Sequence, residues 1–155
     1  MGSMRLPGKM AMELGDTTVL NWVVQRTLKS KKINKIVLAT STNSIDDEIE
    51  KFFQASEVIV RRGPEQNVLK RFIQVANEFL PEIVVRVCAD NPFVDGEQID
   101  YLVDEFKAAD CDLMFNNTPY LTCNYADGFG AEAIRYNVLS ELDKYNLTIN
   151  KLTYY

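Results

Sequence analysis

The chain has 155 residues, of which 46% are hydrophobic and 25% are charged, and its formal net charge is −5. This length is sufficient for one domain with a buried core, and the acidic balance argues against a general nucleic-acid-binding protein, which needs a basic face. Histidine is absent, which excludes Ser-His-Asp and Cys-His nucleophile mechanisms and the usual zinc sites. Any catalysis must therefore use carboxylates, lysine, arginine or a hard metal ion.

Signals for a membrane or a secretory route are missing from the sequence. No run of about 18 apolar residues occurs, so we expect neither a membrane span nor a signal peptide. Cys88, Cys111 and Cys123 are odd in number and lack metal-ligand spacing. This pattern is typical of reduced thiols, so we expect a cytoplasmic protein.

Helical and strand patterns alternate along the chain. Apolar spacings of three and four predict helices over residues 17–30, 45–55, 66–79, 96–109 and 137–146. The predicted N-terminal caps of all but the third helix are Thr17 or Thr18, Ser44, Asp95 and Asn137. Short β-branched apolar runs predict strands over residues 35–40, 57–61, 83–89, 112–116 and 131–135. This alternation predicts an α/β fold of right-handed βαβ units, with three layers and a mostly parallel sheet.

Ligands of such folds bind beyond the carboxyl ends of the strands, which directs attention to Asp90 and to its neighbour Asn91. Asp90 follows an apolar strand, and one strand-end carboxylate is enough to recruit Mg²⁺ together with a nucleotide. The alternative is an Asx turn, in which Asp90 accepts a backbone hydrogen bond ahead of Pro92. The local pattern leaves both interpretations open.

The first ten residues combine glycines with cationic side chains, as a phosphate-binding loop does. Successive backbone amides at Gly2 and Ser3 form an anion-binding concavity, to which Arg5 and Lys9 add positive charge. The alternative is a solvated terminus, because Met-Gly-Ser is also what an expression vector leaves behind.

Other charged residues have two interpretations each. Arg62 adds positive charge at the strand ends or pairs with surface acids. Arg86, inside an apolar strand, reaches the ligand edge or pairs with a buried acid, and we favour the pairing. Asp127 and Glu132 bracket a glycine-containing segment, where they meet a sugar hydroxyl or merely flank a turn.

The string of residues 1–9, MGSMRLPGK, resembles the opening motif of the cytidylyltransferases that make CMP-activated sugars. That family includes the CMP-acylneuraminate and CMP-KDO synthetases, and the similarity is greatest to its spore coat polysaccharide biosynthesis branch. Further matching segments lie in register at residues 35–40, 62–63, 68–72, 85–92, 112–116 and 127–132.

The resemblance implies a Rossmann-like nucleotidyltransferase fold that transfers CMP from CTP to a sugar and releases pyrophosphate, in surface polysaccharide biosynthesis. It implies that Gly2, Ser3, Arg5 and Lys9 hold the CTP phosphates and that Asp90 binds Mg²⁺, with Arg5, Lys9 and Asp90 as the catalytic residues. It also implies a homodimer that binds neither nucleic acid nor membrane. The residues expected to contact the sugar are Arg62, Asn91, Asp127 and Glu132.

The sequence departs from the family pattern at both ends and at three internal positions. The family's first strand and its C-terminal segment, which carries a second metal-binding aspartate, are not among these residues. We therefore expect residues 1–155 to form a single nucleotidyltransferase-like domain, truncated at both ends. If the chain is taken as given, we expect an exposed sheet edge or a gap beside strand 35–40, which a partner chain fills. Asn67 and Gly130 stand where acids are usual, and Cys88 stands where a polar residue is usual.

Two alternatives to a cytidylyltransferase remain. One is a non-catalytic nucleotide- or sugar-binding or assembly domain of the same fold, inactive through truncation. The other is a glycosyltransferase, because Asp110-Cys111-Asp112 spells the Asp-x-Asp motif of that class. This motif precedes a strand, on the side of the sheet away from ligands, so we expect a helix-to-strand turn there.

Overall fold

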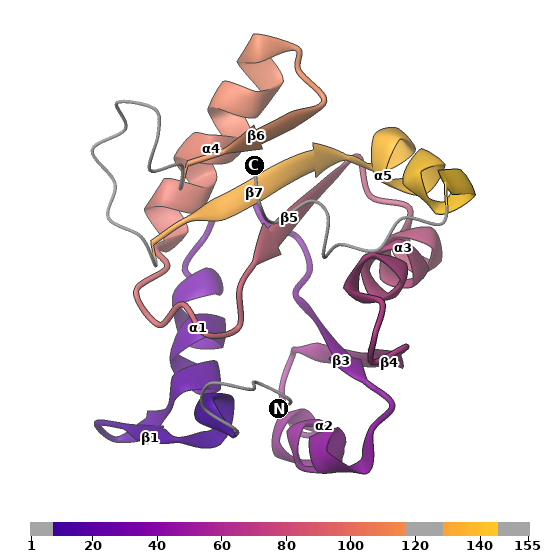
Figure 1. Cartoon of the computed structure of the whole chain (residues 1–155). Helices are drawn as coiled ribbons and strands as arrows, with labels where there is room; N and C mark the ends of the chain where they lie inside the picture. Colours follow the sequence, from indigo (N-terminus) through magenta and orange to yellow (C-terminus); the bar gives the residue numbers. More distant parts are fainter. Residues whose placement is uncertain (1–7, 117–128, 146–155) are drawn as a thin grey trace. The chain divides into compact units, whose positions relative to one another are not determined.

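The computed structural model describes residues 8–116 and 129–145 of the chain (Figure 1). The chain divides into two compact units, one of residues 1–34 with 85–134 and the other of residues 35–84 with 135–155. Helices and strands alternate along the described chain, which confirms the predicted α/β class.

The first unit begins with a 3-10 helix, η1 (Lys9–Ala11), and a short hairpin of β1 (Glu13–Leu14) and β2 (Thr17–Thr18). The hairpin was not predicted, and it turns at Gly15, whose φ of 69° lies in the left-handed region that favours glycine. Helix α1 (Val19–Thr27) follows at once. The Thr18 side chain accepts a hydrogen bond from the backbone nitrogen of Asn21 at 3.2 Å, which confirms the predicted helix cap.

A three-stranded sheet of order β5-β7-β6 lies in this unit, with β5 (Ile83–Val87) beginning in the other one. Helix α4 (Gly96–Ala109) leads from β5 into β6 (Leu113–Phe115) and packs on it. Strand β7 (Ala131–Arg135) then returns antiparallel to β6, between β6 and β5. The β6–β7 pair is therefore antiparallel, a feature that the predicted, mostly parallel sheet did not include.

The two faces of this sheet differ in burial. Ala131 and Ala133 are fully buried, while Glu132 lies between them on the opposite face, as the period of two in a strand requires. Phe115 stands directly opposite Glu132 in the antiparallel pairing and is 42% exposed. Side chains that are directly opposite in an antiparallel pair share a face, so the Glu132 face of the sheet is open to solvent.

The second unit contains β3 (Val37–Ser41), the 3-10 helix η2 (Ser44–Asp46), α2 (Asp47–Phe53), β4 (Ile59–Gly63) and α3 (Val68–Phe79). Strands β3 and β4 pair in parallel, in register from Val37 opposite Ile59 to Ser41 opposite Gly63, as the βαβ prediction requires. Helix α3 packs on both strands, and α5 (Tyr136–Leu142) and η3 (Asp143–Tyr145) complete the unit.

Each unit buries its own apolar core. The largest fully buried side chains of the first unit are Phe106, Ile99 and Val94, and that of the second unit is Ile73. Strand β3 is only half-buried, although it was predicted to be buried on both faces. Among the described strands, β3 pairs with β4 alone, so it forms an edge of the sheet in this part of the chain.

Two predicted helix caps are wrong. Asn43, not Ser44, accepts the hydrogen bond at the start of η2, from the backbone nitrogen of Ile45 at 3.1 Å. Helix α5 begins at Tyr136, one residue before the predicted cap Asn137. The turn predicted at Asp110 is confirmed, since this residue ends α4 with a left-handed φ of 46°.

Within the described residues, no helix has both the length and the apolar character needed to cross a membrane.

Candidate functional site

The segment after β5 forms a tight double turn that holds Asp90 at its tip. The backbone nitrogen of Asn91 donates to the carbonyl of Cys88 at 3.0 Å, and that of Val94 donates to the carbonyl of Asn91 at 3.1 Å. These backbone hydrogen bonds close the turns, so the main chain of Asn91 has a structural role. The Asp90 carboxylate is exposed and pairs with a side chain from another element.

That side chain is Lys9, at the start of η1. Gly8 caps this helix with a left-handed φ of 73°, and its carbonyl accepts a hydrogen bond from the backbone nitrogen of Ala11 at 2.9 Å. The Lys9 ammonium forms an ion pair with the Asp90 carboxylate, and both side chains keep about a third of their surface exposed. Two residues singled out from the sequence, 81 positions apart, therefore meet at the carboxyl end of β5.

A second ion pair lies beside the first. The Arg86 guanidinium on β5 donates to the Glu132 carboxylate on β7 at 2.6 Å. The prediction that Arg86 pairs with an acid is confirmed, and its partner is an acid that was predicted to contact the sugar. The pair places the beginning of β7 next to the end of β5.

Cys88 lies among these charged side chains, and their charges act on the pKa of its thiol. Burial raises the pKa of the Cys88 thiol, the charges of Asp90 and Glu132 raise it further, and those of Arg86 and Lys9 oppose this. For Arg86, burial lowers the pKa, but Cys88, Glu132 and Asp90 outweigh it and the net direction is upward. We call Lys9, Arg86, Cys88, Asp90 and Glu132 the strand-end cluster.

The strand-end cluster has the donors and acceptors that a nucleotide needs. Its two cations match phosphate oxygens, and its carboxylates match a hard divalent cation. The described residues contain no group of three or more His, Cys, Asp or Glu side chains placed to hold a metal ion. Mg²⁺ does not require such a cage, because it usually keeps water and substrate phosphates among its ligands.

The backbone behind the cluster is held firmly. The Asp95 carboxylate caps α4, accepting hydrogen bonds from the backbone nitrogens of Glu97 at 2.9 Å and Gln98 at 3.3 Å, as predicted. Arg26 on α1 donates from Nε to the carbonyl of Val94 at 2.6 Å and also pairs with Asp95. The residues after Asp90 are therefore tied to both α1 and α4.

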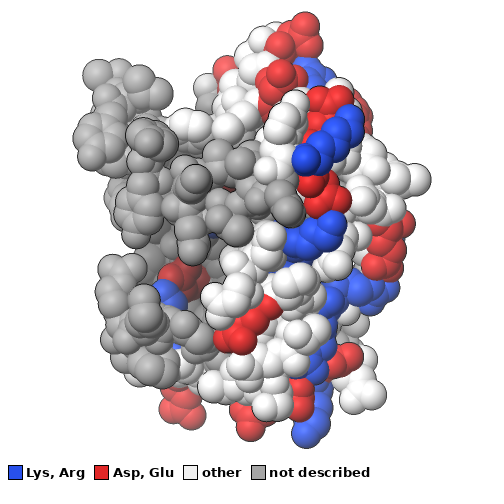
Figure 2. All heavy atoms as spheres, turned by 45° about the vertical axis from the view of Figure 1, so that its right-hand side comes forward, with Lys and Arg blue, Asp and Glu red and all other residues white. Residues whose placement is uncertain are grey.

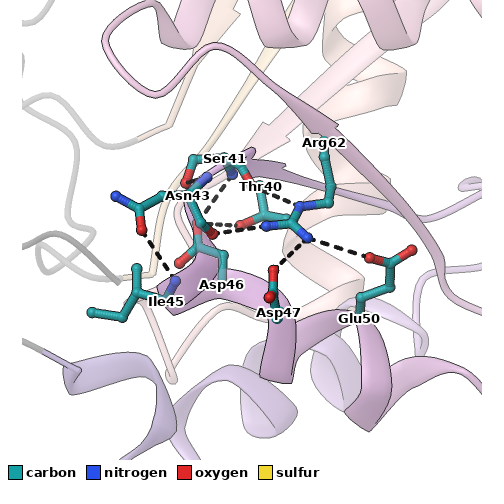
Figure 3. Close-up of polar contacts among 8 residues, drawn as sticks. All are labelled: Thr40, Ser41, Asn43, Ile45, Asp46, Asp47, Glu50 and Arg62. Atoms are coloured by element: carbon teal, nitrogen blue, oxygen red, sulfur yellow. Dashed lines mark hydrogen bonds and ion pairs between the residues drawn. The ribbon is translucent and has the colours of Figure 1, made fainter.

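Arg62 belongs to the second unit, where it holds the loop that follows β3 (Figure 3). Its guanidinium donates to the carbonyls of Ser41 at 2.9 Å and Asn43 at 2.7 Å, and to the Asp47 carboxylate at 2.6 Å. The hydrogen bond that Arg62 donates to the Asp47 carboxylate is the main reason why the pKa of Arg62 is raised. Each guanidinium nitrogen thus has a partner within the unit, and contact with a sugar stays a prediction.

Asp46 is the buried acid of the same loop, and the sequence did not single it out. Only 3% of its surface is exposed, and one carboxylate oxygen accepts from the hydroxyls of Thr40 at 2.7 Å and Ser41 at 2.6 Å and from the backbone nitrogen of Ser41 at 3.1 Å. Burial opposes ionisation, but these hydrogen bonds outweigh it and lower the pKa of Asp46 to about 2. Figure 3 shows both side chains, Asp46 and Arg62, turned toward the Ser41 backbone.

Several predicted site residues are not described by the structure. Gly2, Ser3 and Arg5 of the predicted phosphate loop, and Asp127 of the predicted sugar contact, lie outside the described residues. Cys123 does as well, while the thiol of Cys88 is free. The roles predicted for these four site residues therefore stay predictions.

Charges of both signs are mixed over the face of the molecule in Figure 2. Lysine and arginine side chains lie there among those of aspartate and glutamate. The positive groups of this face are thus balanced by neighbouring carboxylates.

Comparison with known proteins assigns the chain to a family. The sequence model of the family described as Cytidylyltransferase matches residues 1–145. The chain is 38% identical over 107 residues to the spore coat polysaccharide biosynthesis protein SpsF of Bacillus subtilis, an alignment that covers 66% of this chain and 45% of that protein. It spans about half the length of the curated relatives it matches.

Solved structures agree with this assignment. A cytidylyltransferase from Leptospira borgpetersenii superposes with a TM-score of 0.87 at 31% identity, covering 97% of this chain and 63% of that one. A CMP:2-keto-3-deoxy-manno-octonic acid synthetase complexed with CTP superposes with a TM-score of 0.70, covering 97% and 77% of the two chains; at 14% identity this likeness shows the fold alone. The fold is thus the nucleotidyltransferase fold that the sequence predicted, and the chain belongs to the cytidylyltransferase family.

Proposed function

We propose that this chain uses the strand-end cluster to transfer CMP from CTP to a sugar, with release of pyrophosphate. The observation that carries the proposal is the meeting of Lys9 and Asp90 at the carboxyl end of β5, within the segment that the family model matches. A relative named for spore coat polysaccharide biosynthesis supports a role in making surface polysaccharide. CTP is supported by the family description and by the neighbour solved with CTP.

The residues of the strand-end cluster have different roles in the proposed reaction. The Lys9 ammonium exchanges its bond with Asp90 for bonds to the phosphate oxygens of CTP, which orients the triphosphate and offsets its charge. A sugar hydroxyl then attacks the α-phosphorus and gives its proton to solvent water, while the bond between the α-phosphorus and the oxygen that bridges it to the β-phosphorus breaks and pyrophosphate leaves. Such a transfer depends on positioning and charge neutralisation rather than on a histidine.

Mg²⁺ is part of the proposal. Asp90 would hold it, since a strand-end carboxylate beside phosphate oxygens suits this ion. Bound there, Mg²⁺ would supply charge neutralisation on the phosphate oxygens. Arg86 would keep the Glu132 carboxylate away from the ion by holding it in the 2.6 Å pair.

The test is pyrophosphate release from CTP and Mg²⁺ with a panel of sugars that includes 2-keto-3-deoxy-manno-octonic acid and N-acetylneuraminic acid. We expect Lys9→Met and Asp90→Asn each to lower kcat/KM by about 100-fold, the usual effect of removing one charge-stabilising group. Binding of CTP is measured separately by isothermal titration.

Lys32→Met is the matched control. Lys32 pairs with Asp104 in the same unit, and it has a similar exposure to Lys9, but it lies outside the strand-end cluster. Loss of activity in Lys32→Met to the same extent as in Lys9→Met would contradict the proposal. Binding of CTP without pyrophosphate release from any sugar would favour a non-catalytic binding domain instead.

A second copy of the chain and a cytoplasmic location complete the proposal. Among the described strands, β6 is the outer strand of its sheet, and its Leu113 and Phe115 are half-exposed, which is the kind of apolar edge that a partner covers. We expect sedimentation equilibrium to show a dimer that Phe115→Ser weakens, and a monomeric wild type would contradict this part. The free thiol of Cys88 fits a reducing compartment.

A further inference from the structure

Two phenylalanines stack on each other next to the strand-end cluster. The rings of Phe93 and Phe129 have their centroids 5.7 Å apart and their planes 21° apart. Phe93 is 57% exposed although it is a large apolar side chain. Such exposure of an aromatic ring costs free energy unless the ring is covered by something else.

The exposure of Phe93 does not come from a loose backbone. Val94, the next residue, is fully buried, and its carbonyl accepts the 2.6 Å hydrogen bond from Arg26. Its backbone nitrogen closes the turn that begins at Asn91. The chain thus fixes the main chain on either side of Phe93 and presents the ring outward.

Phe129 is anchored in the same way from the other side. It precedes the buried residues Gly130 and Ala131 at the start of β7. The backbone nitrogen of Ala131 donates to the Asn116 side chain at 2.8 Å, which ties this end of β7 to β6. The two rings therefore come from two segments that are 36 residues apart in sequence.

The segments that carry the rings also carry the charged groups of the cluster. Phe93 is three residues after Asp90, and Phe129 is three residues before Glu132. The ion pair between Arg86 and Glu132 holds the two segments together at the ends of β5 and β7. An apolar surface is thus placed beside carboxylates and a guanidinium.

We propose that the Phe93–Phe129 stack is the platform on which the acceptor sugar lies during the transfer. One face of a sugar ring that consists mainly of C–H groups packs on the exposed Phe93 ring, while hydroxyls of the sugar reach the charged groups of the cluster. Aromatic rings joined to a few polar groups are the usual composition of a small-molecule site. This inference rests on the proposed function and adds the class of acceptor, a sugar with a C–H face.

A nucleobase is the competing occupant, because bases also stack on aromatic rings. A base in addition needs partners for its polar edge. The backbone nitrogens beside the rings, those of Val94 and Ala131, already donate within the protein. These two nitrogens are therefore not available to the polar edge of a base, whereas the hydroxyls of a sugar can reach the charged side chains of the strand-end cluster.

The test compares Phe93→Ala with Phe52→Ala. Phe52 on α2 has the same 57% exposure and also contacts a second phenylalanine, Phe53, with ring centroids 4.9 Å apart. We expect Phe93→Ala to raise KM for the sugar about three- to tenfold and to leave KM for CTP within about twofold. Phe52→Ala is expected to change neither, and circular dichroism checks that both variants fold.

A second measurement separates this inference from the reaction. Saturation-transfer NMR with 2-keto-3-deoxy-manno-octonic acid, N-acetylneuraminic acid and N-acetylglucosamine detects sugar binding without turnover. Signals that Phe93→Ala loses and Phe52→Ala keeps support the platform, even if no pyrophosphate is released. Three results would overturn the platform: equal signals in the two variants, no sugar signal in the wild type, or a rise in KM for CTP alone. Pyrophosphate release by the wild type would still uphold the transfer reaction in each of these cases.

Discussion

Replacement of Asp46 by asparagine tests the loop after β3. The substitution keeps the size of the side chain but removes the charge that the hydroxyls of Thr40 and Ser41 stabilise. The pKa of Asp46 falls from 3.8 to about 2 in the folded chain, and each unit of pKa corresponds to 1.36 kcal/mol. We therefore expect Asp46→Asn to lower the free energy of unfolding by about 2 kcal/mol at pH 7.

The pH dependence gives this prediction a second, independent form. A carboxylate whose pKa is lowered by folding stabilises the folded state fully above the pKa of the unfolded chain, and this stabilisation is lost as the pH falls toward the folded pKa. The difference between the wild type and Asp46→Asn should be constant from pH 7 to pH 5. It should shrink below about pH 4 and disappear near pH 2.

Urea unfolding followed by circular dichroism measures both quantities. Asp47→Asn is the matched control, because Asp47 is the adjacent residue, pairs with Arg62 and has 48% of its side chain exposed. Surface pairs of this kind contribute about 1 kcal/mol or less. The reasoning is refuted if Asp46→Asn costs no more than Asp47→Asn, or if its cost stays the same down to pH 3.

Three other changes have definite expected outcomes. Gly96→Ala should destabilise the chain by about 2 kcal/mol, because the added Cβ would lie 2.6 Å from the backbone nitrogen of Ser30, which cannot move aside. Gly63→Ala should lower the free energy of unfolding by less, about 1 kcal/mol, since its Cβ meets two flexible side chains of α3. If urea unfolding shows that Gly63→Ala is the more destabilising of the two substitutions, this account is contradicted. Arg86→Met should destabilise more than the double variant Arg86→Met/Glu132→Gln, because the single change leaves a half-buried carboxylate without its partner, and thermal unfolding of the two compares them.

The helices and strands with strong local patterns were predictable from sequence. Apolar spacing located α3 and α4, and β-branched runs located β3, β4 and β5, because these signals depend on neighbours a few residues away. The hairpin of residues 13–18 was missed, since strands of two residues carry no periodicity. The antiparallel return of β7 was missed because alternation along a strand does not record the direction of its partner.

The candidate site was predictable only in part. Asp90 was marked by its place after an apolar strand, and Arg86 by its charge within one. The partner of Arg86 lies 46 residues away, so it required the fold. Nothing in the local pattern distinguishes Asp46 from Asp47, yet the fold buries Asp46 and leaves Asp47 half-exposed. The stack of Phe93 on Phe129 likewise has no signal in the sequence.

The ion pair between Lys9 and Asp90 makes each residue the counterion of the other as long as no ligand is bound. An anion that binds to Lys9 leaves the Asp90 carboxylate without its positive neighbour, and a cation that binds to Asp90 releases the Lys9 ammonium from its ion pair. Binding of either ion must then favour binding of the other by the same factor, as thermodynamic linkage requires. A divalent cation or an anion that binds alone therefore has to compete with the ion pair between Lys9 and Asp90. A cation and a nucleotide that bind together replace this ion pair with two new ones, so that no charge is left uncompensated.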